Sequence, residues 1–204
     1  MPAPHYSWRE IDDLPTKDFR VHPRDPNVLL PLRRNWRRLA HVNYRHPDCV
    51  CLITVCVKDQ RRIFLDPRTA IVAREQLTAL RSKHHFRLDA YTLMPDHAHL
   101  VVSPGTSGLS IGRIVGSWKS LTARHLWSLG YSGSPWQRDY DDRVLRWDET
   151  SGEQYGRMIA YVLNNPVRKG LVRDWRDYPF TGCFVKLPGL CNQSRATTRV
   201  APLY

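Results

Sequence analysis

The segment at residues 86–104, FRLDAYTLMPDHAHLVVSP, constrains the fold more than any other part of the sequence. It contains two apolar stretches that are separated only by Asp96 and His97. So short a connection indicates antiparallel strands, because parallel strands need a crossover of about a dozen residues or more. We therefore expect two neighbouring antiparallel strands, at 86–95 and 97–104.

The second of these strands carries an unusual pair of histidines. Side chains two residues apart on a strand project from the same face, so His97 and His99 point together while Ala98 points into the core. Two imidazoles placed in this way can bind one metal ion, although the pattern alone fits two ordinary histidines on a wet face equally well. The histidine-triad nucleotide hydrolases need a third histidine where this chain has Val101. A zinc enzyme needs three protein ligands, and no third His, Cys or Glu is obvious nearby.

The order of the other predicted elements indicates the fold class. Strand and helix patterns alternate as β-α-β-β-α-β-α, which predicts an α+β protein with a ferredoxin-like antiparallel sheet covered on one face by helices. Gly130 is a natural end for the middle helix, and Pro166 is expected to end the last one, with irregular structure after it. The elements besides the hairpin are expected as strands at 49–57 and 135–147 and as helices starting near Pro67, over 108–130 and over 148–166.

The charge balance points to a polyanionic partner. The chain has 31 Lys and Arg residues against 19 Asp and Glu, a formal net charge of +12, and a basic excess of this size is typical of nucleic-acid binding. Basic and aromatic residues are interleaved over 33–45, RRNWRRLAHVNYR, so Arg37 and Arg38 are candidates for DNA contacts. A solvated basic arm would have the same composition.

The sequence also bears on location and on cysteine chemistry. No apolar run approaches the roughly 20 residues of a membrane span. The first residues lack the pattern of a secretory signal, so we expect a cytoplasmic, nucleoid-associated protein without a membrane partner. The five cysteines contain no C-x-x-C pair and predict neither a disulfide framework nor a structural zinc site.

A second motif lies in the last predicted helix, in IAYVLNNPVRKGLV (159–172). Tyr161 and Asn165 are four residues apart and share a face of that helix. The phenol can form a phosphotyrosine, and the amide oxygen can complete the shell of Mg²⁺ or Mn²⁺ alongside His97 and His99. Taken alone, the two residues also fit a half-buried packing tyrosine and a C-terminal helix cap.

Together, YTLMPDHAHLVVSP (91–104) and IAYVLNNPVRKGLV resemble the motifs of the REP-associated tyrosine transposases. These are relatives of the insertion-sequence transposases with one catalytic tyrosine and a His-hydrophobe-His motif. The segments KDQRRIFL, SWKSLTARH and PWQRDYDDRV occur in the order that the family shows, and the resemblance covers about residues 41–180. It implies the His-hydrophobe-His endonuclease fold, with a catalytic domain at 45–185, a basic Pro- and Arg-rich extension at 1–44 and a flexible tail at 186–204.

The resemblance also implies roles for individual residues. His97, His99 and Asn165 would hold Mg²⁺ or Mn²⁺, and Tyr161 would attack single-stranded DNA to give a 5′-phosphotyrosine link and a free 3′-OH. Family members act on repeat hairpins as monomers or homodimers, and the basic charge fits such a substrate. Two alternatives stay open: a sequence-specific DNA-binding protein derived from a transposase, without activity, and a phosphoesterase that uses the histidines without a covalent tyrosine.

The chain departs from the family at QRDYDDR (137–143), where the family often reads QRDYYDH. Tyr140 remains there as another candidate nucleophile. We favour Tyr161, because only this tyrosine has an amide side chain four residues further along a predicted helix.

Basic residues near this segment are candidates for DNA contacts. Contacts to backbone phosphates position a protein on DNA, although plain surface charge has the same appearance. Trp136 could stack on a base, but in a chain with seven tryptophans a core role is favoured. The candidate phosphate contacts are Lys119, Arg138 and Arg113.

Overall fold

The computed structural model describes residues 19–22, 25–31, 42–145 and 151–186. The chain divides into two compact units, residues 1–43 and 44–204. In the first unit, β1 (Phe19–His22) and β2 (Asp25–Pro31) pair as antiparallel strands, which the sequence did not predict. Arg37 and Arg38 and almost all of the predicted C-terminal tail lie outside the described residues.

The second unit is built on a five-stranded antiparallel sheet with the strand order β6-β3-β5-β4-β7. Its first six elements follow the β-α-β-β-α-β order of the ferredoxin-like fold, so the predicted fold class is confirmed. Among the described residues, every helix is too short or too polar to cross a membrane. The elements are β3 (Cys51–Cys56), α1 (Pro67–His84), β4 (Arg87–Met94), β5 (His97–Ser103), α2 (Ile111–Ser128), β6 (Asp141–Val144), α3 (Ser151–Arg168) and β7 (Thr181–Cys183).

The predicted hairpin is present as β4 and β5. A turn at Pro95 and Asp96 joins the strands, and Met94 pairs with His97. On its other side β5 pairs with β3, where Cys56 lies opposite His97. We call this end of the sheet the site end.

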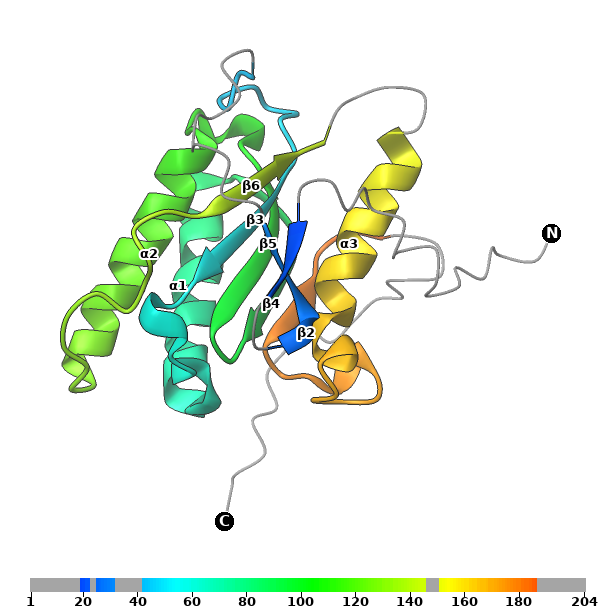
Figure 1. Ribbon diagram of the computed structural model, residues 1–204. Helices are drawn as coiled ribbons and strands as arrows, with labels where there is room; N and C mark the ends of the chain where they lie inside the picture. The colour runs from blue at the N-terminus through cyan, green and yellow to red at the C-terminus, as the bar shows by residue number, and fades with distance from the viewer. Residues whose placement is uncertain (1–18, 23–24, 32–41, 146–150, 187–204) are drawn as a thin grey trace. The chain divides into compact units, whose positions relative to one another are not determined.

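Helices α1 and α2 lie together on one face of the sheet (Figure 1). Asp66 caps α1 by accepting a hydrogen bond from the backbone of Arg68, and Ser110 caps α2 in the same way. The indole of Trp118 donates to the carbonyl of Ala73 at 2.8 Å, which ties the two helices together. The alternate residues of β3 that face them, such as Ile53 and Val55, are fully buried.

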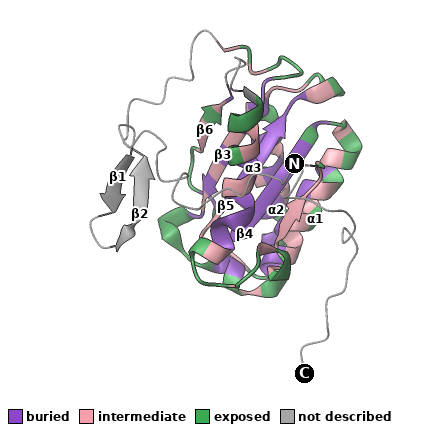
Figure 2. Cartoon of the chain, turned by 90° about the vertical axis from the view of Figure 1, so that its right-hand side faces the viewer, coloured by how far each residue is buried: buried purple, intermediate pink, exposed green. Residues whose placement is uncertain are grey.

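Helix α3 covers the opposite face of the sheet, which we call the α3 face (Figure 1). Its apolar stripe packs with Ala90 and Val101 in a buried cluster that includes Ile159, Val162 and Leu163. The expectation that helices cover one face only is therefore wrong. Figure 2 shows the consequence, a largely buried sheet between helical layers.

Helix α3 continues through Pro166, where the sequence predicted its end. Proline cannot donate to the carbonyl one turn back. The side-chain amides of Asn164 and Asn165 donate to the carbonyls of Ala160 and Tyr161 in the adjoining turn. The helix instead closes in a Schellman motif, in which Leu171 donates to Pro166, and Gly170, with a φ of +67°, donates to Val167.

Strand β7 was predicted to be irregular, and the structure corrects this. It pairs with β4 through Ala90↔Cys183, Tyr91↔Gly182 and Thr92↔Thr181. The ring of Tyr91 occupies the space where a side chain on Gly182 would lie, so only glycine fits there. Cys183 is disulfide-bonded, which the cysteine spacing did not predict, whereas Cys49, Cys51 and Cys56 have free thiols.

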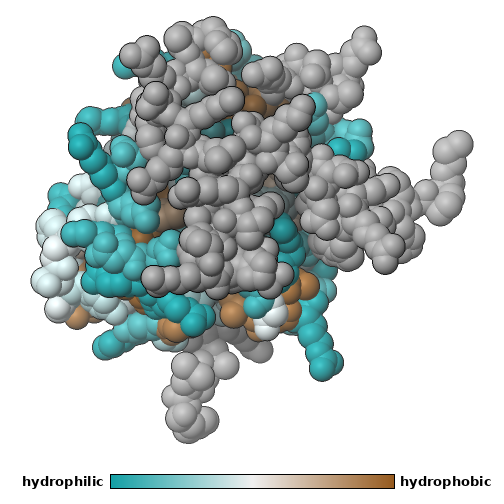
Figure 3. Space-filling view, in the orientation of Figure 1, coloured by the Kyte–Doolittle hydropathy of each residue, from teal (hydrophilic) through white to brown (hydrophobic). Residues whose placement is uncertain are grey.

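The described surface is mainly polar. Figure 3 shows mostly hydrophilic side chains among the described residues on this side, with hydrophobic ones in small separate areas. Large exposed hydrophobic residues in the described part include Leu65, Trp127, Leu129 and Leu171. Of these, Trp127 contributes to a surface hollow that is considered below.

Candidate active site

His97 and His99 project from β5 at the site end, on the α3 face. Their Nε2 atoms lie 3.2 Å apart, and their rings meet edge to face with centroids 4.7 Å apart. Two nitrogen ligands held about 2.1 Å from one ion would lie at about this separation. The two imidazoles therefore converge as a metal-binding pair requires.

Each histidine is oriented by a partner at its other nitrogen. Nδ1 of His97 lies 2.6 Å from a carboxylate oxygen of Asp96, and Nδ1 of His99 lies 2.9 Å from the hydroxyl of Thr54. Burial alone would raise the pKa of Asp96, but the hydrogen bond and charge of His97 outweigh it, so the pKa is lowered. Such outer partners hold the ring of a metal-binding histidine in place and select its tautomer.

His99 is 5% exposed, and its environment keeps it neutral. Burial, with the positive charges of His97 and Arg168, holds the pKa of His99 well below its usual range. Only a neutral imidazole has a lone pair to offer a metal. The donor set therefore fits a divalent ion, and the described residues contain no cluster of three His, Cys, Asp or Glu side chains.

A row of polar residues crosses the sheet through His99. Thr54 pairs with His99 on one side and with Asp141 on the other, while Thr92 and Thr181 continue the row toward β7. Paired residues share a face, so all five side chains lie on the α3 face. Burial, with the charge of neighbouring Asp142, raises the pKa of Asp141. This row depends on strand register, which no local pattern in the sequence reveals.

Tyr161 projects from α3 onto the same place. Its ring meets the His99 ring edge to face, with centroids 5.3 Å apart. Asn165 lies one turn further along, is 5% exposed, and donates through Nδ2 to the Tyr161 carbonyl at 2.8 Å. This bond uses one of the two Nδ2 hydrogens, and Oδ1 is the amide atom with a lone pair to offer a metal.

Arg168 is a site residue that sequence reasoning missed. It follows Tyr161 by seven positions and Asn165 by three, so the three residues share one face of α3. The guanidinium carbon lies 5.3 Å from the centroid of the Tyr161 ring. Burial raises the pKa of Tyr161, whereas the charge of Arg168 and the side chain of Asn165 oppose that rise. Helical spacing would have revealed Arg168 had the helix not been expected to end at Pro166.

The structure shows other contacts for the remaining predicted site residues. Lys119 donates to the carbonyls of Gln137 and Arg138 at 2.7 and 2.9 Å, and burial lowers its pKa. Arg138 is exposed beside it. Arg113 lies in the first turn of α2, which follows the end of β5 away from His97. Tyr140 directly precedes β6, whereas Tyr161 contacts His99. The DNA contacts of Lys119, Arg138 and Arg113 stay predictions.

Part of the chain is similar to a known family of transposases. The family described as "Transposase IS200 like" matches residues 46–144. The match covers slightly less than half of the chain, from just before β3 to the end of β6, and it does not include α3. No curated protein matches it.

Two solved structures are similar to the chain. One is a REP-associated tyrosine transposase bound to a REP hairpin, 19% identical, with a TM-score of 0.56 over 69% of this chain and 80% of that one. The other is an inferred transposase from Deinococcus radiodurans R1, 22% identical, with a TM-score of 0.40 over 55% of this chain and 88% of that one. The first supports the fold assignment.

Proposed function

We propose that the chain is a DNA transposase that cleaves and rejoins single-stranded DNA through Tyr161. The observation that carries this proposal is the contact between Tyr161 and His99, whose Nε2 converges with that of His97. A packing tyrosine would need neither the converging imidazoles nor the cation above its ring. The match to a transposase family supports the general chemistry, and the contact between Tyr161 and His99 supports Tyr161 as the nucleophile.

In the proposed reaction the phenol oxygen of Tyr161 attacks a backbone phosphorus. The P–O3′ bond breaks, the 3′ oxygen leaves as a hydroxyl after taking a proton from water, and the phenol proton is lost to water. The 5′ phosphate stays on Tyr161, so the ester energy is retained. Attack on that phosphotyrosine by another 3′-OH reverses the step and joins a new strand, which explains why no nucleotide cofactor is needed.

We assign His97, His99 and Asn165 to binding Mg²⁺ or Mn²⁺, with Asp96 and Thr54 orienting the two imidazoles. When bound, such an ion polarises the scissile phosphate and offsets the charge of the transition state. Asn165 holds the helical turn beside Tyr161 through its Nδ2 hydrogen bond. Arg168 places a fixed positive charge beside the phenol, where negative charge develops during the attack.

The proposed substrate is a single strand that contains a repeat hairpin. The similar structure is of a transposase bound to a REP hairpin, and the net charge of +12 suits a polyanion. Within this proposal, residues 45–185 form the catalytic domain, residues 1–44 add basic DNA contacts, and residues 186–204 form a flexible tail. The protein acts on the nucleoid in the cytoplasm, as a monomer or homodimer.

A labelled hairpin oligonucleotide with single-stranded flanks, incubated with the protein and Mg²⁺ or Mn²⁺, tests the proposal. We expect a covalent protein–DNA adduct that survives a denaturing gel, needs the metal, and disappears in Tyr161→Phe. Tyr140→Phe is the matched control and should retain the adduct. Cleavage that persists in Tyr161→Phe would indicate a phosphoesterase without a covalent tyrosine, and hairpin binding without cleavage would indicate an inactive DNA-binding protein.

A further inference from the structure

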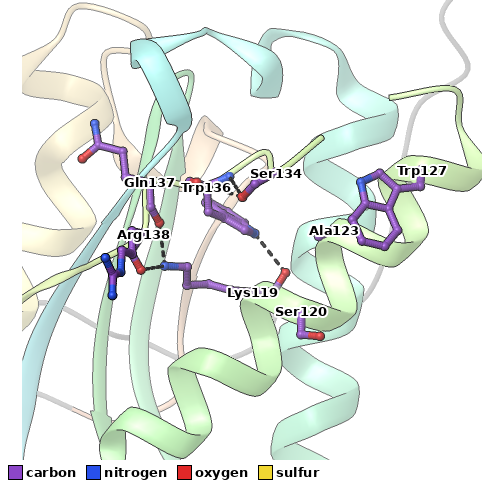
Figure 4. A pocket seen from close by; sticks show the side chains of 8 residues that line it. All are labelled: Lys119, Ser120, Ala123, Trp127, Ser134, Trp136, Gln137 and Arg138. Atoms are coloured by element: carbon purple, nitrogen blue, oxygen red, sulfur yellow. Dashed lines mark hydrogen bonds between the residues drawn. The ribbon is translucent and has the colours of Figure 1, made fainter. Parts of the chain in front are cut away.

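A hollow of about 290 Å³ lies between α2 and the segment 134–138 (Figure 4). We call it the slot. Ala123 and Trp127 line it from α2, and Trp136 lines it from the facing segment. Its volume is near the lower end of small-molecule sites, roughly 300–1,000 Å³, so it accommodates a single planar group and no duplex.

Trp127 forms an exposed but fixed wall of the slot. It is 51% exposed, and its indole Nε1–H donates to the carbonyl of Gly133 at 2.7 Å. Trp118 and Trp136, by contrast, are buried, as expected of tryptophans in a core. Trp127 therefore presents a pre-oriented aromatic face to solvent, which suits stacking of a ligand.

The rest of the slot is equally well ordered. Ala123 precedes Trp127 by one helical turn, and its small side chain leaves open the space between the two tryptophans (Figure 4). The ring of Trp136 packs on Trp118, with centroids 5.0 Å apart, and on Phe64, 5.5 Å apart. Its Nε1–H donates to the carbonyl of Lys119 at 3.1 Å, so the slot is preformed.

Charge and position connect the slot with the DNA site. Lys119 and Arg138 lie at its edge, so a phosphate beside the slot would meet positive charge. The segment is joined to β3, because Trp136 pairs with Val57 and Gln137 donates to the carbonyl of Cys56 at 2.9 Å. Cys56 in turn pairs with His97, so the slot adjoins the site end of the sheet.

We propose that the slot binds one unpaired nucleobase of the DNA strand that is cleaved. This inference rests on the proposed function and adds a base-binding subsite that stacks the base on Trp127, while cations at the edge face the adjoining phosphates. An aromatic platform beside cations is the usual arrangement for holding unpaired bases. Stacking of this kind changes affinity by about 5- to 150-fold per base.

Binding of hairpin oligonucleotides to the Tyr161→Phe protein, followed by fluorescence anisotropy, separates binding from cleavage. Each unpaired nucleotide of the flanks is replaced in turn by an abasic site. We expect one position at which the abasic site weakens binding about 10-fold. In Trp127→Ala the intact oligonucleotide should bind about 10-fold more weakly, and the abasic site at that position should have no further effect.

Three further variants sharpen this test. Trp127→Phe should keep most of the affinity because it retains an aromatic face, and Ala123→Leu should lose affinity because its side chain fills the slot. Leu129→Ala, a change of an exposed apolar residue outside the slot, should leave binding unchanged. Circular dichroism checks the folding of each variant.

The outcomes distinguish failure of the slot from failure of the proposed function. Strong hairpin binding with no effect of Trp127→Ala and Ala123→Leu would overturn the slot alone. An abasic effect of the same size in Trp127→Ala as in the parent would also overturn it. Absence of any hairpin binding by the parent protein would overturn both.

Discussion

At the scale of single residues, Arg168 places a positive charge over the ring of Tyr161, the proposed nucleophile. A buried tyrosine is a poor nucleophile, because burial raises the pKa of Tyr161 and keeps the phenol protonated. The guanidinium of Arg168 lies over the ring and acts against that effect. The same charge helps to keep His99 neutral. One exposed arginine thus favours the reactive form of both the proposed nucleophile and a proposed metal ligand.

We predict that Arg168→Ala slows formation of the covalent adduct about 10- to 100-fold at saturating DNA, because it removes a positive charge from the place where negative charge develops. Single-turnover kinetics with the hairpin oligonucleotide measure this rate. Arg168→Lys should recover part of it, since a lysine restores the charge without the planar group.

Lys169→Ala is the control for this prediction, because it removes an exposed cation from the adjacent position on α3. Its adduct rate at saturating DNA should match that of the unmodified protein. If Arg168→Ala weakened DNA binding as much as it slowed the reaction, Arg168 would be a DNA contact without a role in activating Tyr161.

At the scale of elements, part of the candidate site can be predicted from the sequence and part cannot. The β4–β5 hairpin is predictable because its turn is short, and the shared face of His97 and His99 follows from strand alternation alone. Pairing of Thr54 with both His99 and Asp141 is not predictable in this way, because it depends on the register of strands far apart in the chain.

Two local signals also mislead. Pro166 normally stops a helix, but here the flanking turn is supported by the Asn164 and Asn165 amides, and Gly170 ends α3. Strand β7 has only three residues with Gly182 at its centre, so it shows no alternating pattern. The reason for the glycine lies in the partner strand β4, where the ring of Tyr91 covers Gly182.

We predict that Gly182→Ala lowers the free energy of unfolding by about 1–3 kcal/mol, because the new methyl group overlaps the ring of Tyr91 and either the ring or β7 must move. Urea denaturation followed by circular dichroism measures the change. Gly156→Ala on α3 is the matched control, since nothing lies within 4 Å of the added carbon. It should raise the stability by up to about 1 kcal/mol through helix propensity. Equal effects of the two changes would contradict the role of Tyr91.

At the scale of the whole molecule, both proposed DNA contacts meet at one end of the sheet. Tyr161, the proposed nucleophile, contacts His99 from α3 on one face, and the slot lies beside α2 on the side of the other face. The strand end that contains Cys56 lies between them, since Cys56 pairs with His97 and accepts a hydrogen bond from Gln137. A single strand that passes around this end can place a phosphate at Tyr161 and a base in the slot.

Charge and stacking make separable contributions to such binding. Each phosphate neutralised by a cation releases counterions, so the logarithm of the binding constant falls with the logarithm of the salt concentration by about 0.7 per phosphate contact on a single strand. Stacking on an aromatic ring releases no counterions. Arg138 and Trp127, which line the same slot, should therefore respond differently to salt.

We predict that Arg138→Ala reduces the steepness of this salt dependence by about 0.7, whereas Trp127→Ala lowers the affinity at every salt concentration and leaves the slope unchanged. Anisotropy titrations of the hairpin oligonucleotide in a series of salt concentrations measure both quantities. Lys83→Ala is the control, because this exposed lysine precedes Arg87, which pairs with Ser103 at the end of the sheet opposite His97. Its slope should equal that of the unmodified protein. A slope that changes equally in Lys83→Ala and Arg138→Ala would mean that DNA is attracted by the overall charge of the molecule and is not guided around the site end.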